Sequence, residues 1–222
     1  YFSRLLIKGD FDFSKNNNLS QMISIFALSM VAVGFAAPGA MSHNLVINSI
    51  GIFGALFFAS LAMLLMLIKL TMGFKNMFEK GLGLEAAPSI WILIPILTLL
   101  GITFIRVSFG LEHNYATPLA KSSLFVFTST ILSLQIIFGI LGYIVMKKMV
   151  YFEKYIHSND KSSVSFALIC PGVAFFVFGM FFVNFGLAFN GIVAKYSIAY
   201  FILMVPFIYV QIKTIVYFFK LY

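Results

Sequence analysis

Long apolar segments alternate with short polar connections along the whole chain. Six segments are long enough for an α-helix to cross a bilayer, which takes roughly 17 to 25 apolar residues. They cover residues 21–37, 45–68, 89–105, 122–146, 163–189 and 198–219. The segments are continuously apolar and do not alternate in steps of two, so they predict helices and not barrel strands. Helices also satisfy their own backbone hydrogen bonds where no water is present.

The basic residues are distributed unevenly over the polar connections. Twelve of the fifteen Lys and Arg residues fall on one side of the membrane if the six segments cross it in turn. Only Arg106, Lys121 and Lys195 fall on the other side. Basic residues concentrate in cytoplasmic loops, so this split predicts that both ends of the chain are cytoplasmic. We call the first, third and fifth spans the outward spans, and the other three the return spans.

A short motif repeats in the basic connections. It reads Phe13-Ser14-Lys15, Phe78-Glu79-Lys80 and Phe152-Glu153-Lys154, and each copy precedes an outward span. Self-similarity at a fixed place in each unit indicates an internal repeat. The predicted repeat unit is a helical hairpin made of one outward and one return span.

Prolines follow the same alternation. Each outward span carries one, at Pro38, Pro95 and Pro171, whereas Pro206 is the only proline in a return span. A proline inside a helix frees a carbonyl and bends the helix. Bent or broken helices commonly line the path in transport proteins. We therefore predict an all-α polytopic membrane protein in which three hairpins form one transmembrane domain, over residues 1–222, around a central path.

The start of the chain predicts a truncation. The sequence opens without Met on Tyr1-Phe2-Ser3-Arg4, followed by Leu5-Leu6-Ile7-Lys8, and no signal-peptide pattern follows. We interpret this stretch as the tail of an earlier helix, with a short interfacial amphipathic segment as the alternative.

Composition excludes several classes of function. The chain is 61% hydrophobic and 10% charged, whereas soluble domains carry about 25% charged residues. The basic pI near 9.6 therefore reflects membrane topology and does not predict nucleic-acid binding. No acidic residue falls within a predicted span, which disfavours a proton relay. No catalytic or cofactor motif is present, so we expect neither an enzyme nor a cofactor.

Few residues in or near the spans have functional chemistry. Arg106 follows the third span on the sparsely charged side, where it either attracts anions into an outer vestibule or snorkels to the interface. His43 and His113 fall on that same side and are candidate ligands of a metal or a b-type haem. The single cysteine, Cys170, precedes Pro171 and is either a small packing residue or a functional thiol. Asn184, in the fifth span, packs on another helix or lines a wet path.

Two segments resemble the tellurite-resistance/dicarboxylate transporter family, which includes slow anion channels. They are the start of the third span, Pro88-Ser89-Ile90-Trp91-Ile92, and the start of the fifth, Ser163-Val164-Ser165-Phe166-Ala167. The adjoining Leu168-Ile169-Cys170-Pro171-Gly172-Val173 also resembles the TsoY branch of that family, in which the cysteine position is in some members selenocysteine. The resemblance implies ten helices as five hairpins around a pore, of which this chain would hold the fifth to tenth.

The family likeness also implies a gate. Its pore is closed by a phenylalanine on the ninth helix, but Ile169, Cys170 and Pro171 stand where that residue is expected. Phe166 and Phe175 are then the gate candidates. A pore of three hairpins is incomplete unless the preceding helices exist or several copies of the chain assemble, so a homo-oligomer is one expectation.

The sequence thus favours transport of small anions, such as dicarboxylate, sulfite or another oxyanion, by a channel or carrier in a bacterial inner membrane. The outward spans would line the path, with Pro38, Pro95, Cys170, Pro171 and Asn184 along it and Arg106 at its outer mouth. A membrane redox protein that uses Cys170, or His43 with His113, is the alternative. A purely structural subunit without any path is a third interpretation.

Overall fold

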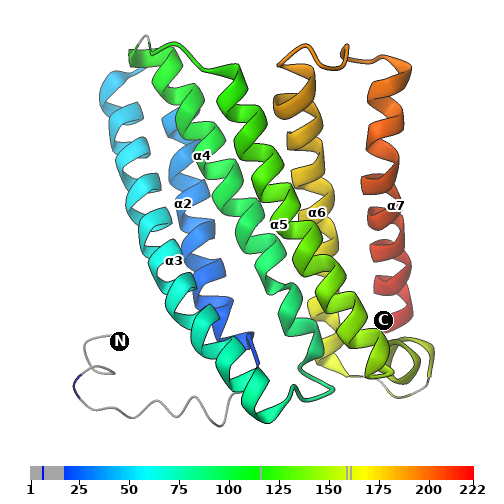
Figure 1. Ribbon diagram of the computed structural model, residues 1–222. Coiled ribbons are helices and arrows are strands. Elements are labelled where there is room, and N and C mark those ends of the chain that lie inside the picture. The colour runs from blue at the N-terminus through cyan, green and yellow to red at the C-terminus, as the bar shows by residue number, and fades with distance from the viewer. Residues whose placement is uncertain (1–6, 8–17, 116, 159, 161) are drawn as a thin grey trace.

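The computed structural model describes residues 7, 18–115, 117–158, 160 and 162–222. In this part of the chain all the regular structure is helical, and six helices are long and apolar enough to span a bilayer. Figure 1 shows them as one bundle, with α2, α3 and α4 on one side and α5, α6 and α7 on the other. The chain is therefore an all-α polytopic membrane protein, as its apolar pattern predicts.

The six spans arise from elements with the following bounds. The main helices are α2 (Ile23–Met41), α3 (Leu45–Lys80), α4 (Leu93–Tyr115), α5 (Lys121–Lys148), α6 (Ile169–Phe181) and α7 (Ile198–Leu221). Short 3₁₀-helices precede the outward helices α2, α4 and α6: η2 (Ser20–Met22), η3 (Ala87–Ile92) and η5 (Ser163–Leu168). Two π-helical segments complete the list, η4 (Glu153–His157) and η6 (Phe182–Ala188).

Helix α3 is longer than predicted. The expected span ended at residue 68, with Lys69, Lys75 and Lys80 in a connection, but the helix runs on to Lys80. Nothing in residues 69–80 breaks a helix until Gly81, whose φ of 74° suits the residue after a helix end. Lys69 is buried, and its Nζ donates to the Gln21 carbonyl at 2.9 Å. The additional turns of α3 therefore bind, through Lys69, the segment at the start of the first hairpin.

Helix α4 is also longer than predicted, and it is the central helix of the bundle. The expected span ended at residue 105, but the helix continues to Tyr115, so Arg106 and His113 lie inside a helix and not in a loop. Of the spans, this one is the most enclosed, with 72% of its apolar window buried. Pro118 is the first residue that stops the helical pattern, and Gly110 is tolerated because other backbones lie close to it.

The prolines of the third and fifth spans do not break a helix in the middle of the membrane. Pro95 and Pro171 are each the third residue of an α-helix, α4 and α6, and each follows a six-residue 3₁₀-helix. Proline is tolerated in a first turn because its missing N–H has no helical partner there. Pro38, in contrast, lies inside α2 near its end. The feature that the third and fifth spans share is therefore a 3₁₀ start followed by a proline in the first α-helical turn. It is not a bend in the middle of the helix.

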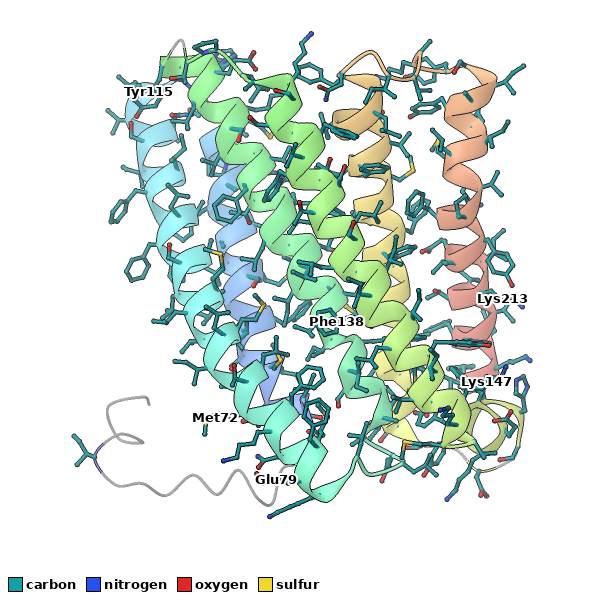
Figure 2. All side chains as sticks on the ribbon, in the orientation of Figure 1. Met72, Glu79, Tyr115, Phe138, Lys147 and Lys213 are labelled. Atoms are coloured by element: carbon teal, nitrogen blue, oxygen red, sulfur yellow. The ribbon has the colours of Figure 1, made fainter. Side chains whose placement is uncertain are left out.

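The two ends of the bundle differ in charge. The end that carries Lys75, Lys80, Lys147 and Lys148 is called the basic end, and the opposite one, near Tyr115, the far end. Figure 2 shows Glu79 and Lys147 at the basic end and Tyr115 at the far end. The Phe78 and Phe152 copies of the repeated motif both lie at the basic end, beside the ends of α3 and α5. The copy at Phe13 and the Tyr1 stretch, Ile7 apart, lie outside the described residues.

Glycine contacts bring α2, α3 and α4 together near the far end. A Cβ on Gly110 would collide with the carbonyl oxygen of Gly39, and one on Gly51 would lie 2.6 Å from the Gly39 nitrogen. Asn48, fully buried in α3, donates through Nδ2 to the carbonyls of Gly39 and, at 3.4 Å, Gly110. Small residues allow membrane helices to approach closely, and a polar side chain can then bond across them.

Candidate functional site

The outward helices share a cavity at the basic end, here called the shared cavity. Its volume is about 270 Å³, and it includes three of the residues predicted to line a path: Pro95, Cys170 and Pro171. The remaining lining residues come from the starts of the same three spans and are Ser20, Ile23, Phe26, Ala86, Pro88, Ser89, Ile92, Val164 and Ala167. The walls are mainly apolar, and the exposed Cys170 carries the only thiol of the chain.

A buried serine fixes the 3₁₀ leading segment in a similar way in two of the hairpins that form the shared cavity. Ser89 and Ser165 are each the third residue of their 3₁₀-helix, and both are buried. The Ser89 hydroxyl accepts a hydrogen bond from the Leu19 N–H at 3.1 Å. The Ser165 hydroxyl lies 2.7 Å from the hydroxyl of buried Tyr151. Each serine thus fixes its leading segment to the chain that comes before an outward helix.

A helical stripe leads from the shared cavity toward the far end. On a helix of 3.6 residues per turn, positions seven or eleven residues apart lie on nearly the same face. Arg106 is eleven residues after Pro95 on α4, and Val33 is seven residues after Phe26 on α2. Arg106 therefore lies on the cavity-lining face of α4, about 16 Å further along the helix. We call the continuous surface of these stripes on α2, α4 and α6 the outward-helix face.

Arg106 joins two of the outward helices. Its guanidinium is half-buried and donates to the Val33 carbonyl of α2 at 3.2 Å. Pro38 lies in the next turn of α2 and supplies no N–H for the Gly34 carbonyl, which loosens the backbone beside Val33. Among the described residues, no carboxylate forms an ion pair with Arg106. Arg106 therefore lies inside helix α4 and not in a connection, and its place at an outer mouth stays a prediction.

A second cavity lies near the far end and is called the far cavity. It has a volume of about 480 Å³, and Asn184 and Lys195 are its polar lining residues. Asn184 donates to the Met180 carbonyl at 2.8 Å and accepts from the Tyr200 hydroxyl at 3.1 Å. Both functions of its amide are thus used, so Asn184 ties η6 to α7 and also borders the cavity.

A cluster of aromatic rings borders the far cavity on the outward helices α4 and α6. Phe109, one turn after Arg106, lies with its ring centroid 5.2 Å from that of Phe185, and Phe181 lies 5.4 Å from Phe185. Phe181 is eleven residues after Cys170, and so belongs to the same stripe of α6. Phe181 and Phe185 also line the far cavity. A hydrophobic constriction of this kind can close a path by excluding water.

The two predicted gate residues lie elsewhere. Phe166 is exposed, and its ring lies 6.2 Å from that of Phe218 on α7. Phe175 packs against Phe207 on α7, at 5.3 Å. Neither residue lines the shared cavity, so the structure brings both to the α7 side of α6. Phe181 is not among the predicted gate residues. Its spacing of eleven residues from Cys170 is the sequence signal that places it on the same face of α6.

The structure brings His43 and His113 into direct contact. Nδ1 of His43 and Nε2 of His113 are 2.7 Å apart, and the ring centroids are 4.4 Å apart. Two nitrogens on one tetrahedral zinc ion would stand about 3.3 Å apart, and axial haem ligands bind on opposite faces of the haem. Within the described residues, no third His, Cys, Asp or Glu joins them as a metal group. The two rings form a hydrogen-bonded pair that links the α2–α3 loop to α4.

Comparison with known proteins identifies no relative. No family model matches the chain, and neither a curated protein nor a solved structure matches it.

Proposed function

We propose that the protein transports small anions across the membrane along the outward-helix face. The observation that carries the proposal is Arg106, a half-buried cation that lies within a span on the same stripe as the shared cavity. An Arg at the centre of a membrane helix costs about 2.5–3.5 kcal/mol on insertion scales, so it is retained where it has a partner or a wet path. Within the described residues its hydrogen-bond partner is the Val33 carbonyl, which leaves most guanidinium donors for a passing anion.

The order of groups along the outward-helix face supports this proposal. From the basic end the face presents the shared cavity, then Arg106, then the Phe109–Phe181–Phe185 cluster, and then the far cavity with Lys195. Cations without nearby carboxylates raise the local concentration of anions. Carboxylates and other oxyanions suit a guanidinium because it can donate two parallel hydrogen bonds to two oxygens of one group. Dicarboxylate, sulfite and related oxyanions are therefore the proposed substrates, in agreement with the resemblance of the leading segments.

A path along the outward-helix face must also be enclosed on the side that is remote from the rest of the bundle. We propose that a second copy of the chain encloses it there, in an inner membrane with both ends of the chain in the cytoplasm. The twelve basic residues on one side support this orientation.

The test is anion flux into proteoliposomes that contain the full chain. We expect uptake of sulfite, malate or nitrate, and a loss of at least about tenfold in Arg106→Gln, since one charge-assisted hydrogen bond is worth roughly 1.5–3 kcal/mol. Arg106→Lys keeps the charge but not the planar donors, so its flux is expected to lie between the two.

The matched control is Lys148→Gln, which removes an exposed cation at the basic end that lines neither cavity. Its flux is expected to equal that of the unmodified chain. Folded protein that carries none of the three anions, or unchanged flux in Arg106→Gln, would refute the proposal.

A further inference from the structure

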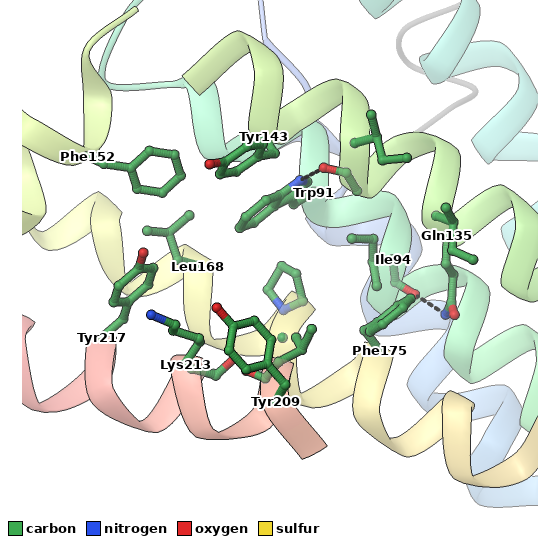
Figure 3. Close-up of a pocket in the computed structure, with 17 residues that line it drawn as sticks. Trp91, Ile94, Gln135, Tyr143, Phe152, Leu168, Phe175, Tyr209, Lys213 and Tyr217 are labelled. Carbon is green, nitrogen blue, oxygen red and sulfur yellow. Dashed lines mark hydrogen bonds between the residues drawn. The ribbon is translucent and has the colours of Figure 1, made fainter. Parts of the chain in front are cut away.

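A groove between α5 and α7 lies beside the proposed path and has only Pro171 of its lining in common with the shared cavity. It is called the lateral groove, has a volume of about 540 Å³ and lies between α5 and α7, with α6 and η3 as its floor. Figure 3 shows its lining, in which six aromatic side chains surround an opening: Trp91, Tyr143, Phe152, Phe175, Tyr209 and Tyr217. Tyr143 and Tyr209, at its two rims, are both exposed. The groove therefore opens sideways toward the hydrocarbon.

Gln135, one of the residues that line the groove, has a side-chain oxygen without a partner in the described part of the chain. Gln135 is fully buried, and its Nε2 donates to the Ile94 carbonyl at 3.2 Å and to the Thr98 hydroxyl at 2.7 Å. A carbonyl can only accept, so this end of the amide is the nitrogen. Oε1, the acceptor, is buried and has no hydrogen-bond partner among the described residues. Buried acceptors are rarely left unpaired, and Gln135 is the residue with such an acceptor, among the described ones, that also lines the groove, where a ligand donor could reach it.

A cation stands nearer to the mouth of the groove. Lys213 lies in α7, eight residues before its end at Leu221, and Figure 3 shows it between Tyr209 and Tyr217. Its Nζ lies 5.6 Å from the Tyr209 ring centroid. No carboxylate in the described part of the chain pairs with it. Lys213 is thus a donor for a ligand oxygen within a largely apolar lining.

We propose that the lateral groove binds a lipid-soluble hydroxylated aromatic compound, a hydroquinone headgroup on an alkyl tail, which enters from the bilayer. The aromatic lining stacks on the ring, one ring O–H donates to Gln135 Oε1, and the other oxygen accepts from Lys213. The tail leaves between α5 and α7. A plain acyl chain has no donor and would leave Gln135 unpaired, so a phospholipid fits the groove less well.

The chain carries its own reporter for this site. Trp91 is the only tryptophan, and it lines the groove with its Nε1 held by the Gly139 carbonyl at 3.0 Å. Saturable quenching of Trp91 emission therefore measures occupancy. The full chain is reconstituted in phosphatidylcholine nanodiscs under argon and titrated with decyl-hydroquinone. A second titration uses decyl-1,4-dimethoxybenzene, which has the same ring and tail but no donor.

We expect decyl-hydroquinone to bind at least about tenfold more tightly than its dimethyl ether, because one hydrogen bond to a buried acceptor distinguishes them. In Gln135→Leu the two ligands should bind within about twofold of each other. Lys213→Gln should weaken hydroquinone binding several-fold. Lys154→Gln should leave it unchanged, since Lys154 also lies over a tyrosine ring at the basic end but outside the groove.

Two outcomes would overturn the proposal. One is equal affinity for the two ligands in the unmodified chain. The other is loss of hydroquinone binding when phosphatidylglycerol is added to the nanodiscs, together with recovery in Lys213→Gln, which would make the groove a phospholipid site. If Gln135→Leu does not fold, the ligand pair and the two lysine variants decide the question alone. Anion flux does not enter this test, so it stands or falls apart from the proposed function.

Discussion

At the scale of single residues, small side chains determine how closely the helices of the bundle pack. Gly39, Gly51 and Gly110 leave no space for a side chain between α2, α3 and α4. Hydrocarbon is as apolar as leucine, so helix association in a membrane depends on such close packing and on bonds like those of Asn48. The larger residues on the outside of α3, among them Phe53, Phe57 and Leu64, are exposed to lipid and contribute little to that association.

We expect Gly110→Ala to destabilise the bundle by about 1–3 kcal/mol, because its Cβ would meet the Gly39 carbonyl and two backbones would have to separate. Gly34→Ala is the matched control, since a Cβ there meets no atom within 4 Å. Alanine at Gly34 should be neutral or stabilise α2 by about 0.5–1 kcal/mol. Unfolding of both variants in detergent micelles by denaturant measures this, and equal stability of the two would contradict the packing argument.

The residue scale also shows where sequence reasoning reached its limit. Cys170 and Pro95 were selected from their places in the spans, and the structure brings them to one cavity. Nothing in the sequence distinguishes Gln135 from the other polar residues of the fourth span, because a sequence does not reveal that one amide oxygen is unpaired. His43 and His113 are seventy residues apart, and their contact depends on α4 continuing ten residues beyond the predicted end of its span.

At the scale of elements, hydropathy located all six spans but misplaced two ends by about ten residues. Apolar content ends where a helix leaves the hydrocarbon, whereas the helix itself ends at a breaker such as Gly81. The 3₁₀ starts of the spans were not predicted, since their residues are as apolar as those of the α-helices that follow. Their common form in η3 and η5 nevertheless agrees with the hairpin repeat that the prolines indicate.

The leading segment η5 depends on the hydroxyl of Tyr151, which lies between the spans of α5 and α6. Burial raises the pKa of Tyr151 above its usual value of 10.0, although the hydrogen bond with Ser165 acts in the opposite direction. The folded protein therefore holds this proton at a pH where the unfolded chain releases it. The contribution to stability is complete below about pH 10 and is lost as the pH rises through the raised pKa.

We expect the melting temperature of the unmodified chain to fall toward that of Tyr151→Phe as the pH rises from 9 to 11.5. Phenylalanine keeps the ring but has no proton to lose, so the difference between the two chains isolates Tyr151 from the lysines that titrate in both. Thermal unfolding in detergent over this pH range measures it. A difference that stays constant with pH would contradict the assignment.

At the scale of the whole molecule, hydropathy indicates a membrane bundle, and the charge distribution predicts its orientation. Of the described basic residues, those of the far end are few, and they include Lys121 and Lys195. Because α4 is longer than predicted, Arg106 lies in a helix and not in a connection. Twelve basic residues nevertheless still fall on one side and three on the other. The predicted orientation of the bundle in the membrane therefore depends on the lysines of the basic end together and not on any single residue.

Single cysteines placed in a Cys170→Ala chain test this orientation. Lys195→Cys at the far end and Asp160→Cys at the basic end are both exposed positions. A membrane-impermeant maleimide applied to intact cells should label Lys195→Cys and should label Asp160→Cys only after lysis. The reverse pattern would invert the topology and with it the direction of the proposed path.

The close packing of α2, α3 and α4 also has a consequence for how the protein is made. These helices precede α5, α6 and α7 in the sequence, so their shared interface can form before those three helices are synthesised. The buried amide of Asn48 is already bonded once Gly110 has emerged. Helix α7 has only 11% of its apolar window buried, and α6 is its principal neighbour. The hairpin of α6 and α7 is therefore held to the rest of the bundle mainly through α6.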